Sequence, residues 1–197
     1  MSTRFLPYNK QSINEEDIET VANVLRGPFL TTGPQSDLFE SEIAAYVGSR
    51  YAVVCNSGTA ALQLAMAALE VGKNDRVLTS PISFIADANV VKHMGGDVLF
   101  ADVSDKTANM SVESAGEVLR AHEGVKVIMP VHFGGQPFDL EKFSALADCY
   151  GASIVEDACH ALGAEYRDQM GIWHKVGNCA FSKLTAFSFH PIKSITT

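Results

Sequence analysis

The stretch VKVIMPVHFGGQPFDLEKFSALADCYGASIVEDACH, residues 125–160, sets the fold class of this chain of 197 residues. The apolar run Val125–Val131 is typical of a buried strand, and Leu140–Tyr150 has the apolar spacing of a helix that ends at Gly151. A second short apolar run, Ser153–Val155, follows at once. A strand, a helix and another strand in this order predict a parallel βαβ unit.

The same rhythm extends through the rest of the chain. A helix is expected at Glu15–Arg26, with Asn14 as its cap and Asp17 as the partner in a capping box. Other helices are expected at residues 36–47, 59–69, 84–94 and 112–122. Other strands are expected at residues 51–55, 76–80 and 98–102, with two more candidates at 180–181 and 186–189. The sequence therefore predicts an α/β fold of three layers, with a mostly parallel sheet, right-handed crossovers and helices on both faces.

Composition limits the kinds of partner. The formal net charge of −8 argues against nucleic acid, because the basic surface that phosphate backbones require is missing. The four cysteines form no C-x-x-C pair, which fits a reduced setting. The first ten residues lack the apolar core of a signal peptide, and no apolar run approaches the roughly 20 residues of a membrane helix. A soluble cytoplasmic protein is expected.

Ligands of such sheets collect at the carboxyl ends of the strands, so the residues that follow each strand are the candidate site. The segment Asn56–Ala61 begins a helix, where free N–H groups and the helix dipole favour a phosphate group. Gly58 permits close approach of the backbone, and Ser57 and Thr59 add hydroxyl donors. A capped helix with an ordinary glycine turn is the alternative for this motif.

A carboxylate follows the strand at 153–155. Asp157 beside a pyridine nitrogen would keep that ring protonated, which an electron-sink cofactor requires, and His160 could donate to a ring oxygen. One alternative is that Asp157 only caps the next turn and His160 is half-buried. A metal site of Asp157, Cys159 and His160 is a second alternative, but no fourth ligand is evident.

Two further residues complete the chemistry. Phe84 follows a strand and a proline bend, where an aromatic ring can stack on a flat ligand, although a core phenylalanine fits equally well. Lys193 follows the last expected strand; a lysine there can form a Schiff base with an aldehyde cofactor and can then move a proton. Ser188 is a further phosphate donor. A solvated surface lysine is the alternative for Lys193.

Five motifs resemble, in order, those of the DegT/DnrJ/EryC1/StrS sugar aminotransferases, which are fold-type I enzymes dependent on pyridoxal 5'-phosphate. They are GPFLTTGP at 27–34, NSGTAAL at 56–62, SFIADAN at 83–89, EDACHALG at 156–163 and FSFHPIK at 187–193. The resemblance covers nearly the whole chain. It implies the large cofactor-binding domain of such an enzyme, with amino transfer as the activity.

The resemblance also implies a role for each matching position. Lys193 would be the catalytic residue that carries the cofactor, with Asp157 at the pyridine nitrogen, His160 at the ring oxygen and Phe84 on the ring face. The other residues implied at the cofactor are Ser57, Gly58, Thr59, Ala60 and Ser188. Those implied at the sugar substrate are Tyr8, Pro28, Phe29, Leu30, Thr31, Gly58 and Ser188. No metal is implied.

The closing segment 189–197 is most similar to the branch of the family that aminates C4 of a UDP-4-keto-6-deoxy-N-acetylhexosamine, giving the UDP-4-amino-4,6-dideoxy-N-acetyl-altrosamine precursor of pseudaminic acid. The resemblance thus implies a nucleotide-sugar substrate, an amino-acid donor such as glutamate, and a homodimer when the protein is full-length. Family members are about twice as long, so residues 1–197 are expected to hold most of the large domain without the small C-terminal domain. Asp87 departs from the family, because many relatives have a small or hydroxyl residue there.

Two alternatives stay open at this point. The first is an oxidoreductase dependent on nicotinamide, but the G-x-G-x-x-G that should follow the first strand is absent. The second is a truncated fragment that is inactive and binds no cofactor.

Overall fold

A parallel sheet of five strands forms the centre of the computed structural model, which describes residue 7 and residues 10–195. The strands run in the order β2 (Asp97–Phe100), β1 (Arg76–Thr79), β3 (Val125–Met129), β4 (Ser153–Asp157) and β7 (Leu184–Ala186). Each neighbouring pair is parallel. The predicted sheet is therefore confirmed.

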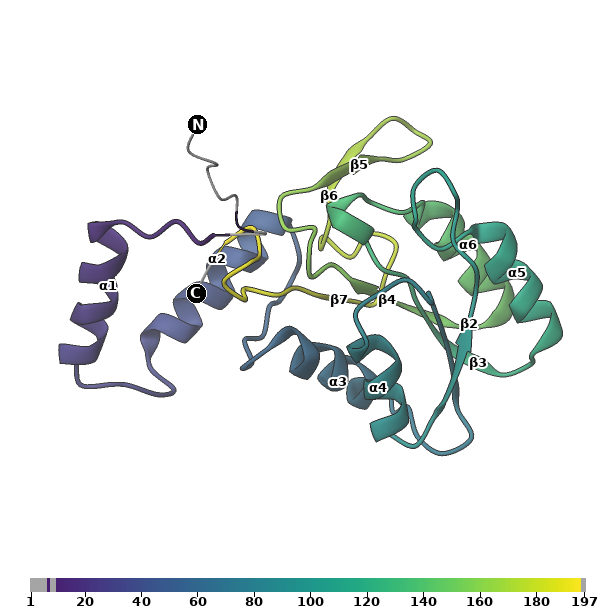
Figure 1. Cartoon of the computed structure of the whole chain (residues 1–197), viewed down its shortest axis with the longest axis horizontal. Coiled ribbons are helices and arrows are strands. Elements are labelled where there is room, and N and C mark those ends of the chain that lie inside the picture. The colour runs from purple at the N-terminus through teal and green to yellow at the C-terminus, as the bar shows by residue number, and fades with distance from the viewer. Residues whose placement is uncertain (1–6, 8–9, 196–197) are drawn as a thin grey trace, which may run out of the picture.

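Helices cover both faces of this sheet (Figure 1). One face carries α3 (Gly58–Ala68) and α4 (Ala86–His93), and the other carries α5 (Val112–Ala121) and α6 (Leu140–Tyr150). Each face has its own apolar core, because side chains alternate along every strand. On β3, for example, Val127 packs toward α3 and α4 while Ile128 packs toward α5 and α6. The three-layer architecture follows directly.

Two helices precede this body. Helix α1 (Glu15–Arg26) has the predicted capping box, in which the side chains of Asn14 and Asp17 each accept a backbone N–H. None of its residues is buried, and Figure 1 shows it standing away from the sheet. Helix α2 (Pro34–Val47) leads back to the body, where Lys175 donates to the carbonyl oxygen of Tyr46 at 2.9 Å. No helix in the described part of the chain is long and apolar enough to cross a membrane.

The strand expected at residues 51–55 is wrong. This segment joins neither sheet, and Tyr51 and Val53 are each 79% exposed. Its backbone finds side-chain partners instead: the Val54 N–H donates to Glu40 Oε1 at 2.8 Å, and the Ser49 hydroxyl donates to the Tyr51 carbonyl at 3.0 Å. The apolar pattern is that of a strand, but a strand also needs a neighbour, which the pattern does not supply.

The end of the chain also differs from expectation. Residues 180–181 lie in a bend, and the last sheet strand is Leu184–Ala186 rather than 186–189. An antiparallel pair, β5 (Glu165–Arg167) and β6 (Trp173–Lys175), was not predicted. Its strands are only three residues long, too short for a periodic pattern to be visible in the sequence.

A buried polar network lies beneath the carboxyl end of β4. Glu156 and His132 are both fully buried, and their Oε2 and Nε2 atoms are 2.8 Å apart. The other carboxylate oxygen accepts hydrogen bonds from the hydroxyls of Ser182 and Thr185. This one carboxylate therefore ties β4 to the loop after β3 and to the approach to β7.

Replacing Glu156 with alanine should destabilise the protein strongly, because the buried His132 and two partly buried hydroxyls would lose their shared partner. Breaking a buried pair in this way costs about 3–5 kcal/mol. Glu156→Gln is the matched control, since its amide can still reach all three partners. Urea unfolding followed by circular dichroism measures both; equal losses for the two variants would contradict this account of the network.

Candidate functional site

The carboxyl ends of β4 and β7 lie side by side and define the candidate site. Asp157, the last residue of β4, is in register with Ala186, the last residue of β7. The N–H of Ala158 then donates to the Ala186 carbonyl at 2.9 Å. The two predicted motifs, 156–163 and 187–193, therefore leave the sheet from neighbouring points.

Asp157 is held in a fixed position. Its side chain is buried, with the residue only 3% exposed, and Oδ1 accepts the N–H of Cys159 at 3.0 Å. Its backbone N–H donates to the Pro130 carbonyl, and its own carbonyl accepts from His132, each at 3.0 Å. Hydrogen bonds to the loop after β3 therefore fix the main chain of Asp157, and the Cys159 N–H orients its carboxylate.

The start of α3 lies close to the segments that follow β4 and β7. Ser57 caps the helix, and its Oγ accepts the Ala60 N–H at 3.1 Å. A Cβ atom at Gly58 would lie 3.0 Å from Cys159 Sγ and 3.1 Å from Ser188 Cβ. The absence of a side chain at Gly58 thus brings the helix start, the β4 motif and the β7 motif together, which is the close approach expected of that glycine.

Lys193 and His160 belong to the same electrostatic cluster. The pKa of His160 is lowered, first by partial burial and then by the positive charge of Lys193, while Asp157 opposes the shift. The pKa of the Cys159 thiol is raised, mainly by burial and then by the charge of Asp157. Lys193 and Asp157 are therefore both near enough to Cys159 and His160 for their charges to affect the pKa values of those two side chains.

The remaining predicted residues lie at different distances from this cluster. Phe84 is 70% exposed just before α4, on the face that also carries α3. The loop of residues 28–31 joins α1 to α2 and lies apart from the ends of β4 and β7 in Figure 1, with Phe29 and Leu30 largely exposed. Tyr8 lies outside the described residues.

One buried acid was not predicted as part of the site. Asp87, in the first turn of α4, is fully buried, and neither carboxylate oxygen has a hydrogen-bond partner among the described residues. Burial, and then the charge of Asp157, raises the pKa of Asp87 to about 8. An acid among the apolar positions of a helix, between Ala86 and Val90, was the signal in the sequence.

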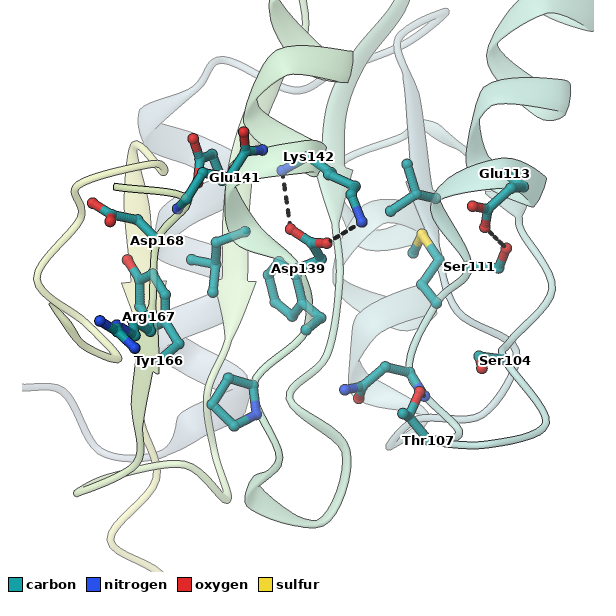
Figure 2. Close-up of a pocket in the computed structure, with 17 residues that line it drawn as sticks. Ser104, Thr107, Ser111, Glu113, Asp139, Glu141, Lys142, Tyr166, Arg167 and Asp168 are labelled. Atoms are coloured by element: carbon teal, nitrogen blue, oxygen red, sulfur yellow. Dashed lines mark hydrogen bonds and ion pairs between the residues drawn. The ribbon is translucent and has the colours of Figure 1, made fainter. Parts of the chain in front are cut away.

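A separate open cavity of about 640 Å³ lies on the α5 and α6 side of the sheet (Figure 2). None of the predicted site residues lines it. Its acidic side chains already have partners: Asp139 pairs with Lys142, Glu113 accepts from Ser111, and Glu141 accepts from the N–H of Gln169. Its polar groups therefore stabilise the surrounding loops. Within residues 10–195 no cluster of three or more His, Cys, Asp or Glu could hold a metal ion.

Comparison with known proteins places this geometry among aminotransferases. Residues 11–197 match the DegT/DnrJ/EryC1/StrS aminotransferase family. The chain is 35% identical, over 198 residues, to the UDP-4-amino-4-deoxy-L-arabinose–oxoglutarate aminotransferase of Shewanella sediminis; the match covers all of this chain and 48% of that protein.

Two solved structures have the same fold. The PLP-form of Spr1654 from Streptococcus pneumoniae, described as a sugar aminotransferase, superposes with a TM-score of 0.86 at 28% identity, covering 97% of this chain and 50% of that one. Helicobacter pylori PseC, an aminotransferase involved in the biosynthesis of pseudoaminic acid, superposes with a TM-score of 0.84 at 30% identity, covering 96% and 49%. The chain spans about half the length of the curated relatives it matches.

Two adjacent glycines allow a direct test of how the loop after β3 supports the site. Both have positive φ, but a Cβ at Gly135 would lie 2.7 Å from the His160 carbonyl oxygen, whereas one at Gly134 would meet nothing within 4 Å. Gly134→Ala should cost only the left-handed strain, about 1–2 kcal/mol. Gly135→Ala should cost more and should shift the NMR signals of His160. Identical stabilities and spectra for the two variants would contradict the close contact.

Proposed function

Because the chain belongs to the DegT/DnrJ/EryC1/StrS aminotransferase family, we propose that it carries the pyridoxal-phosphate site of a nucleotide-sugar aminotransferase. The observation that carries the proposal is the junction of β4, β7 and α3: Asp157 pairs with Ala186 at the strand ends, and Cys159 and Ser188, which follow those strands, pack against Gly58. The Spr1654 relative has been solved in a PLP-form, which supports the same cofactor for this chain.

The residues present fit this cofactor on structural grounds. A buried carboxylate that is oriented by a backbone N–H suits a pyridine nitrogen, which must stay protonated. The open N-terminus of α3, with Thr59 and the nearby Ser188, suits a phosphate group, because Gly58 lets the backbone approach. The exposed ring of Phe84 is available to stack on a flat ligand.

Each side chain then has a defined task. The carboxylate of Asp157 would hold the ring nitrogen, and the first turn of α3 with Ser188 would hold the phosphate. The Nζ atom of Lys193 would hold the cofactor covalently and, as a free amine, would hold and move a proton. The lowered pKa of His160 favours a neutral imidazole, which can donate one hydrogen bond to a ring oxygen. When bound, pyridoxal phosphate supplies the electron sink for removal of that proton.

The substrates that we propose are an amino acid, glutamate in particular, and a nucleotide-linked 4-keto-6-deoxy sugar. The amino acid exchanges its amino group for the oxygen of one water molecule and leaves as a keto acid. The keto sugar then receives that amino group, and its carbonyl oxygen leaves as one water molecule. The name of the Shewanella relative contains both a UDP-sugar and oxoglutarate, which supports this pair. The closing segment 189–197 supports a UDP-4-keto-6-deoxy-N-acetylhexosamine as the sugar. The likeness to PseC, an aminotransferase involved in the biosynthesis of pseudoaminic acid, supports the route to pseudaminic acid.

The setting of the enzyme is part of the proposal. We place residues 1–197 in the N-terminal segment and large domain of a cytoplasmic enzyme; four free cysteines are consistent with a reducing compartment. A homodimer of the full-length protein is supported by the exposed apolar side chains of α1, which need a partner surface: Ile18, Val21 and Leu25 are each at least half exposed.

Reduction of a mixture of the protein and pyridoxal phosphate with borohydride should label Lys193 covalently. The reason is that only a lysine on the same edge as Asp157 can meet an aldehyde whose ring nitrogen that carboxylate holds. Peptide mass spectrometry locates the label. Lys183→Ala, at an exposed lysine, is the control and should leave the labelling intact; a label spread over surface lysines would refute the assignment.

Full-length protein supplied with glutamate and UDP-4-keto-6-deoxy-N-acetylhexosamine should produce oxoglutarate and an amino sugar. Lys193→Ala should lower the rate at least about 10²-fold, because it removes both the covalent link and the proton carrier. Product formation is followed by chromatography. A Lys193→Ala enzyme that kept the full rate would disprove the mechanism, whereas an active wild type that refused this sugar would disprove only the substrate.

A further inference from the structure

Asp87 and Asp157 form a pair of buried acids on one face of the sheet. Asp87 lies in the first turn of α4, with no exposed surface, and Asp157 lies at the end of β4, with 3%. Both carboxyl groups are buried, neither oxygen of Asp87 has a hydrogen-bond partner among the described residues, and the charge of Asp157 disfavours a charge on Asp87. Charging both in an apolar setting would carry a large cost, so one of them keeps its proton.

The surroundings decide which acid is charged. Asp157 has a donor for its charge, the Cys159 N–H at 3.0 Å, whereas both oxygens of Asp87 lack any partner among the described residues. The closest hydroxyl, that of Ser83, is within donating distance of the carbonyls of Ser80 and Phe84. The charge is therefore better satisfied on Asp157, and the proton belongs on Asp87.

The other charged groups of the region strengthen this division. The positive charge of Lys193, from the segment after β7, lowers the pKa values of Cys159 and His160, which lie two and three residues after Asp157. This charge thus lies on the Asp157 side of the pair. No described cation is among the groups that act on Asp87: burial and Asp157 disfavour its charge, and only Ser83 favours it.

We propose that Asp87 is the protonated member of a carboxyl pair with Asp157, and that it acts as a positioning residue that keeps the negative charge of the pair on Asp157. The inference rests on the proposed function in one respect, namely that Asp157 faces the ring nitrogen of the cofactor. A neutral Asp87 leaves a single negative charge to match the single positive charge of a protonated ring. A charged Asp87 would add a second.

The proton on Asp87 has a measurable effect on stability. The pKa of Asp87 is about 8 in the folded protein and near 3.8 in the unfolded chain. Between these values the folded state binds the extra proton, so the contribution of Asp87 to stability is lost as pH rises from about 4 to about 8. Asp87→Asn cannot lose that proton, so its stability relative to wild type should increase across this window.

The first experiment uses cofactor-free protein, so that its result does not depend on the proposed function. Denaturant unfolding between pH 5 and pH 8, together with infrared spectroscopy of protonated carboxyl groups, compares wild type, Asp87→Asn and the exposed-loop control Asp105→Asn. A carboxyl band at neutral pH that Asp87→Asn removes and Asp157→Asn shifts supports the pair. Absence of the band, or a pH dependence shared by wild type and Asp87→Asn, overturns it.

The second experiment tests the positioning role on protein loaded with pyridoxal phosphate. When the pH is raised in wild type, the absorption band of the bound cofactor should change near pH 8, as Asp87 ionises. Asp87→Asn should abolish this change near pH 8, whereas Asp105→Asn should retain it. A merely structural Asp87 would leave the spectrum unmoved, and that result overturns the role. Failure to load Lys193 at all would count against the proposed function, while the infrared result would still decide the carboxyl pair.

Discussion

The parallel pairing of β4 with β7 is the constraint on which the rest of the site depends. Because parallel strands end at the same edge, the register of Asp157 with Ala186 places the segments that follow them side by side. The main chain of Asp157 is also bonded to the loop after β3, at Pro130 and His132. Backbone hydrogen bonds on both sides, to β7 and to the loop after β3, therefore fix the position of the Asp157 main chain.

Because side chains alternate along β4, the adjacent residues Glu156 and Asp157 lie on opposite faces of the sheet and have different roles. Val155 and Asp157 belong to the face covered by α3 and α4, where the charge of Asp157 acts on Asp87 in the first turn of α4. Ile154 and Glu156 belong to the opposite face, where the carboxylate of Glu156 forms hydrogen bonds with His132 and two hydroxyl groups. Two adjacent acids therefore have unrelated tasks, and a shift of one residue in register would exchange them.

Much of this architecture could be predicted from the sequence, because its signals are local. The capping box of Asn14, the helix Leu140–Tyr150 and the strand before Asp157 each show in a window of a few residues. What could not be predicted depends on partners far along the chain. The segment 51–55 has the composition of a strand but no neighbour in the described structure, and the short pair β5 and β6 exists only through its mutual bonds. For the site, the roles predicted for Asp157, Gly58 and Ser188 stay predictions, although the fold does pack Ser188 against Gly58. The importance of Asp87 depends on how closely α4 approaches β4, which no local pattern shows.

The buried thiol of Cys159 has a consequence for chemical selectivity. A thiolate is a strong nucleophile toward aldehydes, and this cysteine stands two residues from Asp157 and in the same region as Lys193. Burial, reinforced by the charge of Asp157, keeps it in the unreactive thiol form. A carbonyl compound that enters this region can therefore react with the amine of Lys193. The thiol of Cys159 does not compete by forming a sulfur adduct.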